Sequence, residues 1–179
     1  FKTLNLLDKI LPIYKEVIGK LSDLGAEWIQ IDEPILVKDL DEEVISRIKP
    51  TLNELKKASK NSKILITTYF ESLDKKIHEK LSTSDVDAIH LDLVRGAENK
   101  NYIQNANKIL SLGIIDGRNI WKSDLNNKIK FLQQSAKSEK EIIISTSCSL
   151  LYCPYDLDLE KKVPEEIKRW LSFSKQKLN

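Results

Sequence analysis

The sequence predicts an α/β fold, a partial (β/α)8 TIM barrel with about five parallel βα units. Two observations predict it. Short apolar runs alternate with amphipathic helical patterns, and successive runs begin about 25 to 35 residues apart. Alternation of this kind is typical of a parallel sheet with crossover helices. A doubly wound open sheet is the competing architecture, because periodicity alone does not separate the two.

The expected strands are short runs rich in β-branched and apolar residues. They cover residues 27–31, 63–69, 86–94, 113–116 and 141–145. The first expected helix covers residues 6–24 and ends at Gly25, a C′ stop. Its recurring apolar residues are Ile10, Tyr14, Val17 and Leu21.

The later helices are expected between and after the remaining strands. Residues 41–60 form a polar, helix-prone stretch in which Pro50 is expected to begin a second helical piece. Ser123 is the expected N-cap of a further helix, and Pro164 introduces the last one. The apolar residues that mark these helices are Ile77 and Leu81, then Ile103, Ala106 and Leu110, then Leu125, Ile129 and Leu132, and finally Ile167, Trp170 and Leu171, expected to face inward.

Five strands do not close an eight-stranded barrel, so we expect the first three strands to precede Phe1. The sequence contains no methionine and starts with Phe1-Lys2. Both observations indicate that residues 1–179 are a fragment of one domain, the last five strands of a barrel.

Composition and charge exclude several function classes. The chain is 41% hydrophobic and 31% charged, as in ordinary globular proteins. Lys plus Arg number 29 against 27 for Asp plus Glu, so nothing favours a nucleic acid or membrane partner. No apolar run approaches the roughly 18 residues of a membrane span. The two cysteines, Cys148 and Cys153, favour a reducing cytoplasm.

Polar side chains gather where the expected strands end, which is where parallel α/β folds place their chemistry. They are Asp32, Glu33, Thr67, Thr68, Tyr69, Asp92, Arg95, Asp116, Arg118, Ser147 and Cys148. One interpretation is a polar pocket for a charged substrate. The other is that the acids and arginines pair with each other and close the barrel mouth, since no nucleophile–base pair is evident.

The remaining candidate residues favour structural roles. His90 lies between Ile89 and Leu91, so we expect a structural histidine facing the core or the helix layer, whereas His78 is expected in solvent. Cys148 and Cys153 do not have the spacing of a zinc signature, and no Gly-rich phosphate loop is present.

Five motifs together resemble the amino-terminal half of cobalamin-independent methionine synthase. They are Ala26–Leu36, Thr67–Phe70, His90–Val94, Gly117–Trp121 and Ser147–Leu151. They occur in that family's order and spacing, and the resemblance covers essentially the whole chain. It implies that the complete enzyme has two barrels that look like copies of one ancestor, of which the carboxy-terminal copy performs the reaction.

In that family, zinc activates homocysteine as a thiolate, which takes a methyl group from 5-methyltetrahydropteroyltriglutamate. The zinc ligands of the catalytic copy are a His, a Cys two residues later, a Glu and a final Cys. The resemblance places Thr68, Phe70, Asp92 and Cys148 at these positions. It therefore implies that this copy has lost its zinc site, that it is inactive alone, and that zinc is bound by the absent carboxy-terminal barrel.

The resemblance also implies two partners, the catalytic barrel and the polyglutamate tail of the folate. Asp32 matches the acid that contacts the homocysteine amino group in the catalytic copy, and here it is expected to pair with Arg95 or Arg118. We expect no catalytic residue; the substrate-proximal rim is Asp32, Glu33, Thr68, Asp92, Arg95, Asp116, Arg118 and Cys148. A stand-alone module that binds a small ligand, and an autonomous barrel related to uroporphyrinogen decarboxylases, are the alternatives.

Overall fold

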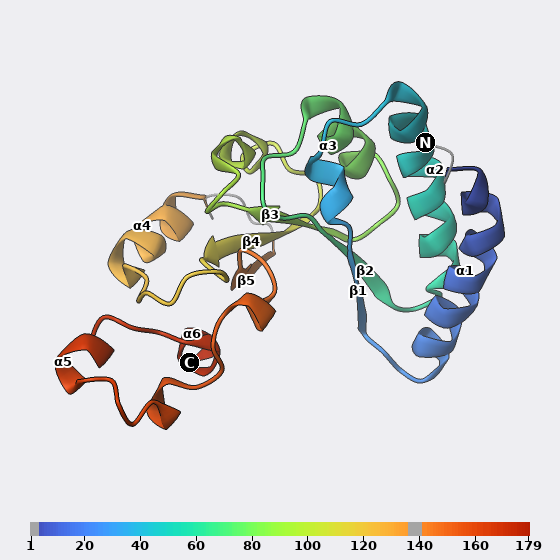
Figure 1. Ribbon diagram of the computed structural model, residues 1–179. Helices are drawn as coiled ribbons and strands as arrows, with labels where there is room; N and C mark the ends of the chain where they lie inside the picture. Colours follow the sequence, from blue (N-terminus) through green and yellow to red (C-terminus); the bar gives the residue numbers. More distant parts are fainter. Residues whose placement is uncertain (1–3, 136–140) are drawn as a thin grey trace.

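A single parallel sheet organises the chain. The computed structural model describes residues 4–135 and 141–179 (Figure 1). Its strands are β1 (Trp28–Asp32), β2 (Lys63–Thr67), β3 (Ala88–Asp92), β4 (Ile109–Ile115) and β5 (Ile142–Thr146). All neighbours are parallel and stand in chain order, β1-β2-β3-β4-β5. A doubly wound sheet reverses its order at a switch point, so the competing architecture is excluded and the predicted α/β fold is confirmed.

Three helices lie between successive strands, one precedes β1, and two follow β5. They are α1 (Leu7–Asp23), α2 (Glu42–Ala58), α3 (Lys75–Ser82), α4 (Leu125–Ser135), α5 (Glu165–Lys168) and α6 (Ser174–Leu178). Short 3-10 helices complete the set: η1 (Leu4–Leu6), η2 (Pro34–Val37), η3 (Ala97–Tyr102), η4 (Leu150–Tyr152) and η5 (Leu157–Leu159). Figure 1 shows α1 and α2 side by side, and the segment from β5 to the carboxyl end as a separate lobe beside α4.

The two faces of the sheet differ in chemistry because successive side chains of a strand point to opposite faces. The helix-facing side chains form the buried core; they include Ile64, Ile66, Ile89, Leu91 and Leu112. The opposite face carries polar side chains towards the carboxyl ends of the strands, where Gln30, Thr67, His90, Ser111 and Ser145 line a cavity together with Leu65. The polar residues of the strands therefore meet on one surface.

The prediction of a helix around Ile103, Ala106 and Leu110 is wrong. The chain instead forms η3 and enters β4 four residues earlier than predicted. All three side chains are buried, so their apolar spacing does mark a buried segment. The segment is not a helix, because Leu110 belongs to β4, where it pairs in register with Ile89.

Other boundaries also differ from the prediction. Pro50 does not begin a separate piece, because α2 runs through it without a break. Asp124, not Ser123, caps α4, since its carboxylate accepts the Asn127 N–H at 3.1 Å. Gly25 adopts the predicted left-handed stop with a φ of 89°.

The carboxyl end departs most from the expected last helix. Only four residues form α5, and Ile167 and Trp170 are exposed instead of inward. Leu171 is buried as predicted and pairs with Trp121 in an antiparallel bridge. The bridge holds this stretch extended, because Ser172 N donates to Ile120 O at 2.7 Å.

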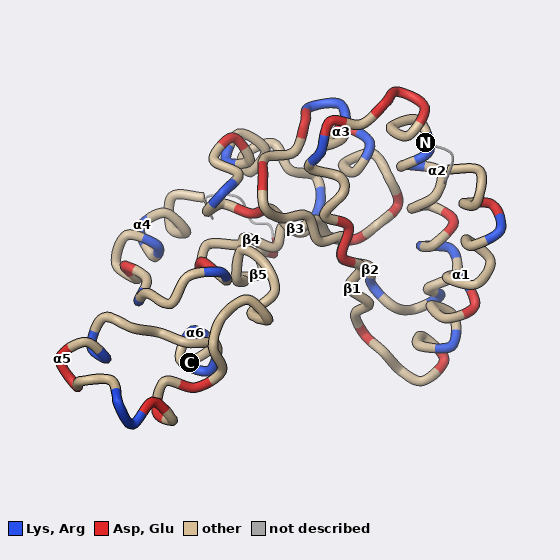
Figure 2. The backbone as a smooth tube through the Cα atoms, in the orientation of Figure 1, with Lys and Arg blue, Asp and Glu red and all other residues tan. Residues whose placement is uncertain are grey.

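Charge is mixed over the described surface. Figure 2 shows acidic and basic residues interspersed along the helices, without a long stretch of one sign. Among the described residues, no helix is both long and apolar enough to cross a bilayer.

An exposed apolar stripe runs along α1. The helix packs on α2 through Ile18, which is buried, whereas the recurring apolar residues that marked this helix in the sequence are exposed. Its side chains are Leu6, Ile10, Ile13, Tyr14, Val17, Leu21 and Leu24, each more than 40% exposed. Their three-to-four-residue spacing makes the stripe continuous, and such a surface marks a contact with another chain segment or protein.

We expect the isolated 179-residue chain to self-associate through this stripe. The double variant Ile13→Glu/Val17→Glu should weaken association at least several-fold, because it places two charges in the apolar face. Its cost in folding stability should stay below about 0.5 kcal/mol, since both side chains are exposed. Sedimentation velocity over a concentration series measures the effect.

Lys9→Glu is the matched control, because it changes the net charge by the same amount at an exposed polar position of the same helix. Equal weakening by the control would show that net charge, not the stripe, governs association.

Candidate functional site

The rim residues named from the sequence all lie at or just after the carboxyl ends of the strands. Asp32 ends β1, Asp92 ends β3, and Thr68 follows β2. Arg95, Asp116, Arg118 and Cys148 lie in the loops that follow β3, β4 and β5. They do not form one cluster, however; the structure divides them into a buried network, a stacked arginine and a cavity.

Asp92 is the centre of the buried network. Its side chain is fully buried, and Oδ2 accepts the Phe70 N–H at 2.9 Å. Oδ1 accepts from Val94 N at 2.8 Å and from Arg95 N at 2.9 Å. Three backbone donors thus occupy the carboxylate, which joins the loop after β2 to the loop after β3. Hydrogen bonds to a charged acceptor of this kind are about twice as strong as neutral ones.

Neighbouring side chains complete the same network. Thr68 Oγ1 donates to His90 O at 2.8 Å, so this hydroxyl is also used internally. Asn99, which is fully buried, donates to Asp92 O at 2.9 Å and accepts from Leu73 N at 2.9 Å. These loops are therefore fixed by their own hydrogen bonds, with the polar atoms directed inward.

Phe70 has an unusual backbone. Its φ is 87°, in the left-handed region that favours glycine and is rare for a bulky residue. The bond from Phe70 N to Asp92 holds this conformation. The Phe70 ring packs edge-on against Tyr69 at 4.6 Å and Tyr152 at 5.9 Å between centroids.

Arg118 lies against the same rings. Its guanidinium carbon is 5.1 Å from the Phe70 ring centroid and 5.2 Å from that of Tyr152. Within residues 4–135 and 141–179, its guanidinium makes neither an ion pair nor a hydrogen bond. A planar group with five N–H donors is thus held in place by cation–π contacts with its donors available. This arrangement suits recognition of a carboxylate.

Asp116 shapes the loop that carries Arg118. Its Oδ1 accepts from Arg118 N at 2.8 Å and from Asn119 N at 3.2 Å, an Asx turn. Cys148 lies beneath this loop and is buried, and burial raises the pKa of its thiol. The thiolate, the form that binds metals and attacks electrophiles, is therefore disfavoured.

The expected ion pair between Asp32 and Arg95 or Arg118 is wrong. Within the described ranges, none of these three side chains takes part in an ion pair. Asp32 instead accepts from Gln30 Nε2 at 2.7 Å and from the Tyr69 hydroxyl at 3.2 Å. Burial, followed by the charge of Asp32, raises the pKa of the neighbouring Glu33.

Asp32 and Cys148 do share a polar cavity of about 210 Å³ on the concave face of the sheet. His90 lines it too and is buried; of the two expected positions, the core or the helix layer, the structure excludes the helix layer. Its Nε2 is 3.2 Å from Ser147 O, and its Nδ1 is 3.0 Å from Ser111 Oγ. A Cβ on Gly113 would lie 2.8 Å from the imidazole, so glycine is needed beside His90.

His78 is likewise not simply solvated. Its ring stacks on Tyr102 with centroids 3.7 Å apart, and burial lowers its pKa.

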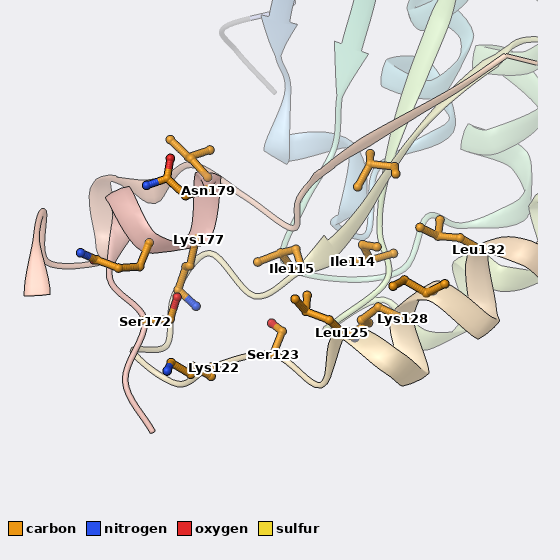
Figure 3. Close-up of a pocket in the computed structure, with 14 residues that line it drawn as sticks. Ile114, Ile115, Lys122, Ser123, Leu125, Lys128, Leu132, Ser172, Lys177 and Asn179 are labelled. Atoms are coloured by element: carbon orange, nitrogen blue, oxygen red, sulfur yellow. The ribbon is translucent and has the colours of Figure 1, made fainter. Parts of the chain in front are cut away.

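A second cavity, of about 470 Å³, lies on the helix side of the sheet (Figure 3). Leu125, Ile129 and Leu132 of α4 face Ile114 and Ile144 there, and α6 closes one end. Lys122, Lys128 and Lys177 lie at its margin. Apart from these lysines the exposed lining is mostly apolar, and among the described residues it includes no acidic side chain, so it offers packing surface instead of catalytic groups.

Sequence reasoning missed several site residues. Tyr152 and Asn99 were not named, nor were Gln30, Ser111 and Ser145. Tyr152 follows directly on the last motif, Ser147–Leu151, so an aromatic side chain there was a usable signal. Nothing in the sequence indicated Asn99, because its role depends on contacts with residues up to 28 positions away.

A family model and similar curated proteins point to the same protein family. A family model described as "Cobalamin-independent synthase, N-terminal domain" matches residues 1–140. Similar curated proteins are named 5-methyltetrahydropteroyltriglutamate–homocysteine methyltransferase. The protein of Nitrosomonas europaea is 43% identical over 182 residues, covering 99% of this chain and 24% of the relative. That of Acidithiobacillus ferrooxidans is 41% identical over 184 residues, covering 100% and 23%. The chain thus spans about a quarter of the length of these relatives.

Among solved structures, the chain is similar to a putative vitamin-B12 independent methionine synthase from Listeria monocytogenes. The TM-score is 0.62 at 17% identity, over 84% of this chain and 52% of that one. At this identity the similarity concerns the fold.

The Asp92 network yields a stability prediction. Asp92→Asn should destabilise the fold by about 1–3 kcal/mol, because one amide N–H₂ would face the Phe70 N–H and leave it unpaired. Urea unfolding measures the change. Asp116→Asn is the matched control: it alters a comparable turn that is only half-buried, and should cost less than about 1 kcal/mol. Equal costs would show that the buried network has no special importance.

Proposed function

Because the chain belongs to the cobalamin-independent synthase family, as part of its N-terminal domain, we propose that it is a non-catalytic barrel portion of a homocysteine methyltransferase. The complete enzyme would transfer a methyl group from 5-methyltetrahydropteroyltriglutamate to homocysteine, as the names of the relatives state. This portion would pack against the catalytic barrel and help to bind the polyglutamate tail of the folate.

One observation carries the proposal: the residues at the family's zinc-ligand positions are unsuited to zinc. Phe70 has no ligand atom, and the Thr68 hydroxyl donates to His90 O. The Asp92 carboxylate is occupied by three backbone N–H groups. Only the buried Cys148 remains, and structural and catalytic zinc sites need at least three protein ligands.

Without that ligand set, this portion cannot supply the thiolate on which methyl transfer depends. A metal-bound thiol is deprotonated near neutral pH, whereas an unassisted thiol is mostly protonated. We therefore assign zinc, homocysteine activation and catalysis to the carboxy-terminal barrel of the complete enzyme. Cys148 and Cys153 are both free, which supports a cytoplasmic location. Nucleic acid and membrane have no part in the proposal.

Within this portion, Arg118 is the residue best suited to bind the polyglutamate tail of the folate. A triglutamate tail presents several carboxylates, and guanidinium groups bind carboxylates bidentately. The contacts with Phe70 and Tyr152 fix the orientation of Arg118 in advance, which lowers the entropy lost on binding.

Metal analysis tests the non-catalytic role. The purified chain, dialysed against zinc and washed, should retain much less than one equivalent, and it should not methylate homocysteine. Cys148→Ser should retain the same amount, because Cys148 has no partner ligands. Stoichiometric zinc that is lost in Cys148→Ser, or methyl transfer by this chain alone, would overturn the proposal.

Steady-state kinetics of the natural full-length polypeptide tests the role of Arg118. Arg118→Gln should raise the KM for the triglutamate donor about threefold to tenfold, since one exposed charge-assisted contact is lost. The KM for homocysteine should not change. Arg95→Gln is the control, an exposed rim arginine without aromatic contacts among the described residues. A proportional change in both KM values would indicate that Arg118 serves barrel packing instead.

A further inference from the structure

Apolar side chains remain exposed around the 470 Å³ cavity on the helix side of the sheet, between α4, β5 and α6. Four of those that line it are more than 50% exposed: Leu125, Ile129, Ile144 and Leu178. Apolar surface gathered in a hollow of this size is typical of a site that binds an apolar group.

The apolar part of the lining is aliphatic. Among the described residues it consists of Ile and Leu side chains, with no aromatic ring. A planar ring system would find no stacking partner there, whereas an alkyl chain packs well against branched methyl groups. The volume of about 470 Å³ has room for about fifteen groups the size of a water molecule, so a chain of about eight to ten carbons fits.

The charges at the margin have one sign. Lys122, Lys128 and Lys177 lie there, and the other polar residues of the lining are uncharged Ser, Gln and Asn side chains. Figure 3 shows Lys122 and Lys177 toward the α6 end of the cavity and Leu132 toward the opposite end. The cavity therefore has a cationic margin at one end and an apolar floor.

These lysines are available to a ligand. In the part of the chain that the structure describes, the Lys122 and Lys128 ammonium groups take part in no ion pair. Asp124 borders the neighbouring cavity, but both of its oxygens accept from Asn127. No acidic side chain of the lining thus balances the lysines.

Lys177 is held in place but keeps bonding capacity. Its Nζ donates to Asn119 Oδ1 and to Trp121 O, each at 3.2 Å, so one of its three N–H groups is left over. Burial lowers the pKa of Lys177, as expected for an ammonium that has no anion against it. An anionic group at this end of the cavity would complement the unbalanced charge.

We propose that the cavity between α4, β5 and α6 is a binding site for a free medium-chain fatty carboxylate. Its alkyl chain would cover the exposed Leu125, Ile129 and Ile144 side chains, and its carboxylate would lie among the marginal lysines. The long alkyl stems of lysines can line apolar surface while their ammonium groups reach the carboxylate, so both parts of the ligand are matched.

Calorimetric titration of the natural full-length polypeptide with octanoate tests the site. 1-Octanol is the matched probe without the charge, and acetate is the matched probe without the chain. We expect saturable binding of one equivalent of octanoate, several-fold weaker binding of 1-octanol and no binding of acetate, because the site needs both the chain and the anion.

Removal of the charges separates the contribution of the lysines. Lys122→Gln/Lys128→Gln should weaken octanoate binding at least threefold and leave 1-octanol binding unchanged, because two of the three marginal charges are lost. Lys130→Gln/Lys162→Gln is the matched control, since it removes two charges from exposed residues that do not line the cavity.

A change in the apolar floor separates the contribution of the chain. Ile129→Gln should weaken octanoate and 1-octanol binding alike, by several-fold, because it places an amide where the alkyl chain would lie. Ile13→Gln is the control, an exposed apolar residue of α1 that does not line the cavity. Both variants should keep the thermal midpoint of the unchanged protein, since both side chains are more than 50% exposed.

Three outcomes would overturn the proposal. Absence of octanoate binding by the full-length polypeptide would show that another part of that polypeptide fills the cavity. Acetate that binds as tightly as octanoate would indicate contact with surface lysines alone. Equal affinity of octanoate and 1-octanol, or of the unchanged protein and Lys122→Gln/Lys128→Gln for octanoate, would remove the anion from the account.

Discussion

The alternation of side chains along five parallel strands is the constraint on which the rest of this structure depends. Because the strands stand in chain order and in register, each residue position recurs across the sheet on the same face. Apolar positions meet the helices and exclude water there. The intervening positions are thereby brought together on the concave face, where Thr67, His90 and Ser111 are neighbours across three strands. One register thus sets both the core and the cavity.

Much of this arrangement could be predicted from the sequence, because it follows from local patterns. Runs such as residues 63–67 are apolar and β-branched, and the glycine at position 25 supplies a stop that few other residues allow. The region around Leu110 could not be predicted, since its apolar spacing fits a helix face and a buried strand equally well. Only pairing with Ile89 decides between them, and pairing is a long-range property.

The site was predictable in place but not in detail. Parallel strands fix where the carboxyl ends lie, so Asp32, Asp92 and Cys148 were correctly placed at the rim. Whether an acid there meets an arginine, a backbone N–H or solvent depends on loop conformation. The Asp92 carboxylate points inward and accepts three backbone N–H groups. The Asp32 carboxylate accepts from the Tyr69 hydroxyl and the Gln30 side-chain amide instead of an arginine. Opposite charges at one rim were not sufficient to form a pair.

The backbone of Phe70 has a consequence for how the rim keeps its shape. A left-handed φ on a large side chain is a conformation that an unconstrained chain would leave, and such strain typically costs about 1–3 kcal/mol. The ring held there by Asp92 is also the surface on which Arg118 rests. The buried Asp92 carboxylate therefore controls the orientation of the exposed Arg118 guanidinium indirectly, through the Phe70 ring. If the strained Phe70 backbone relaxed, the ring would move and Arg118 would lose its support.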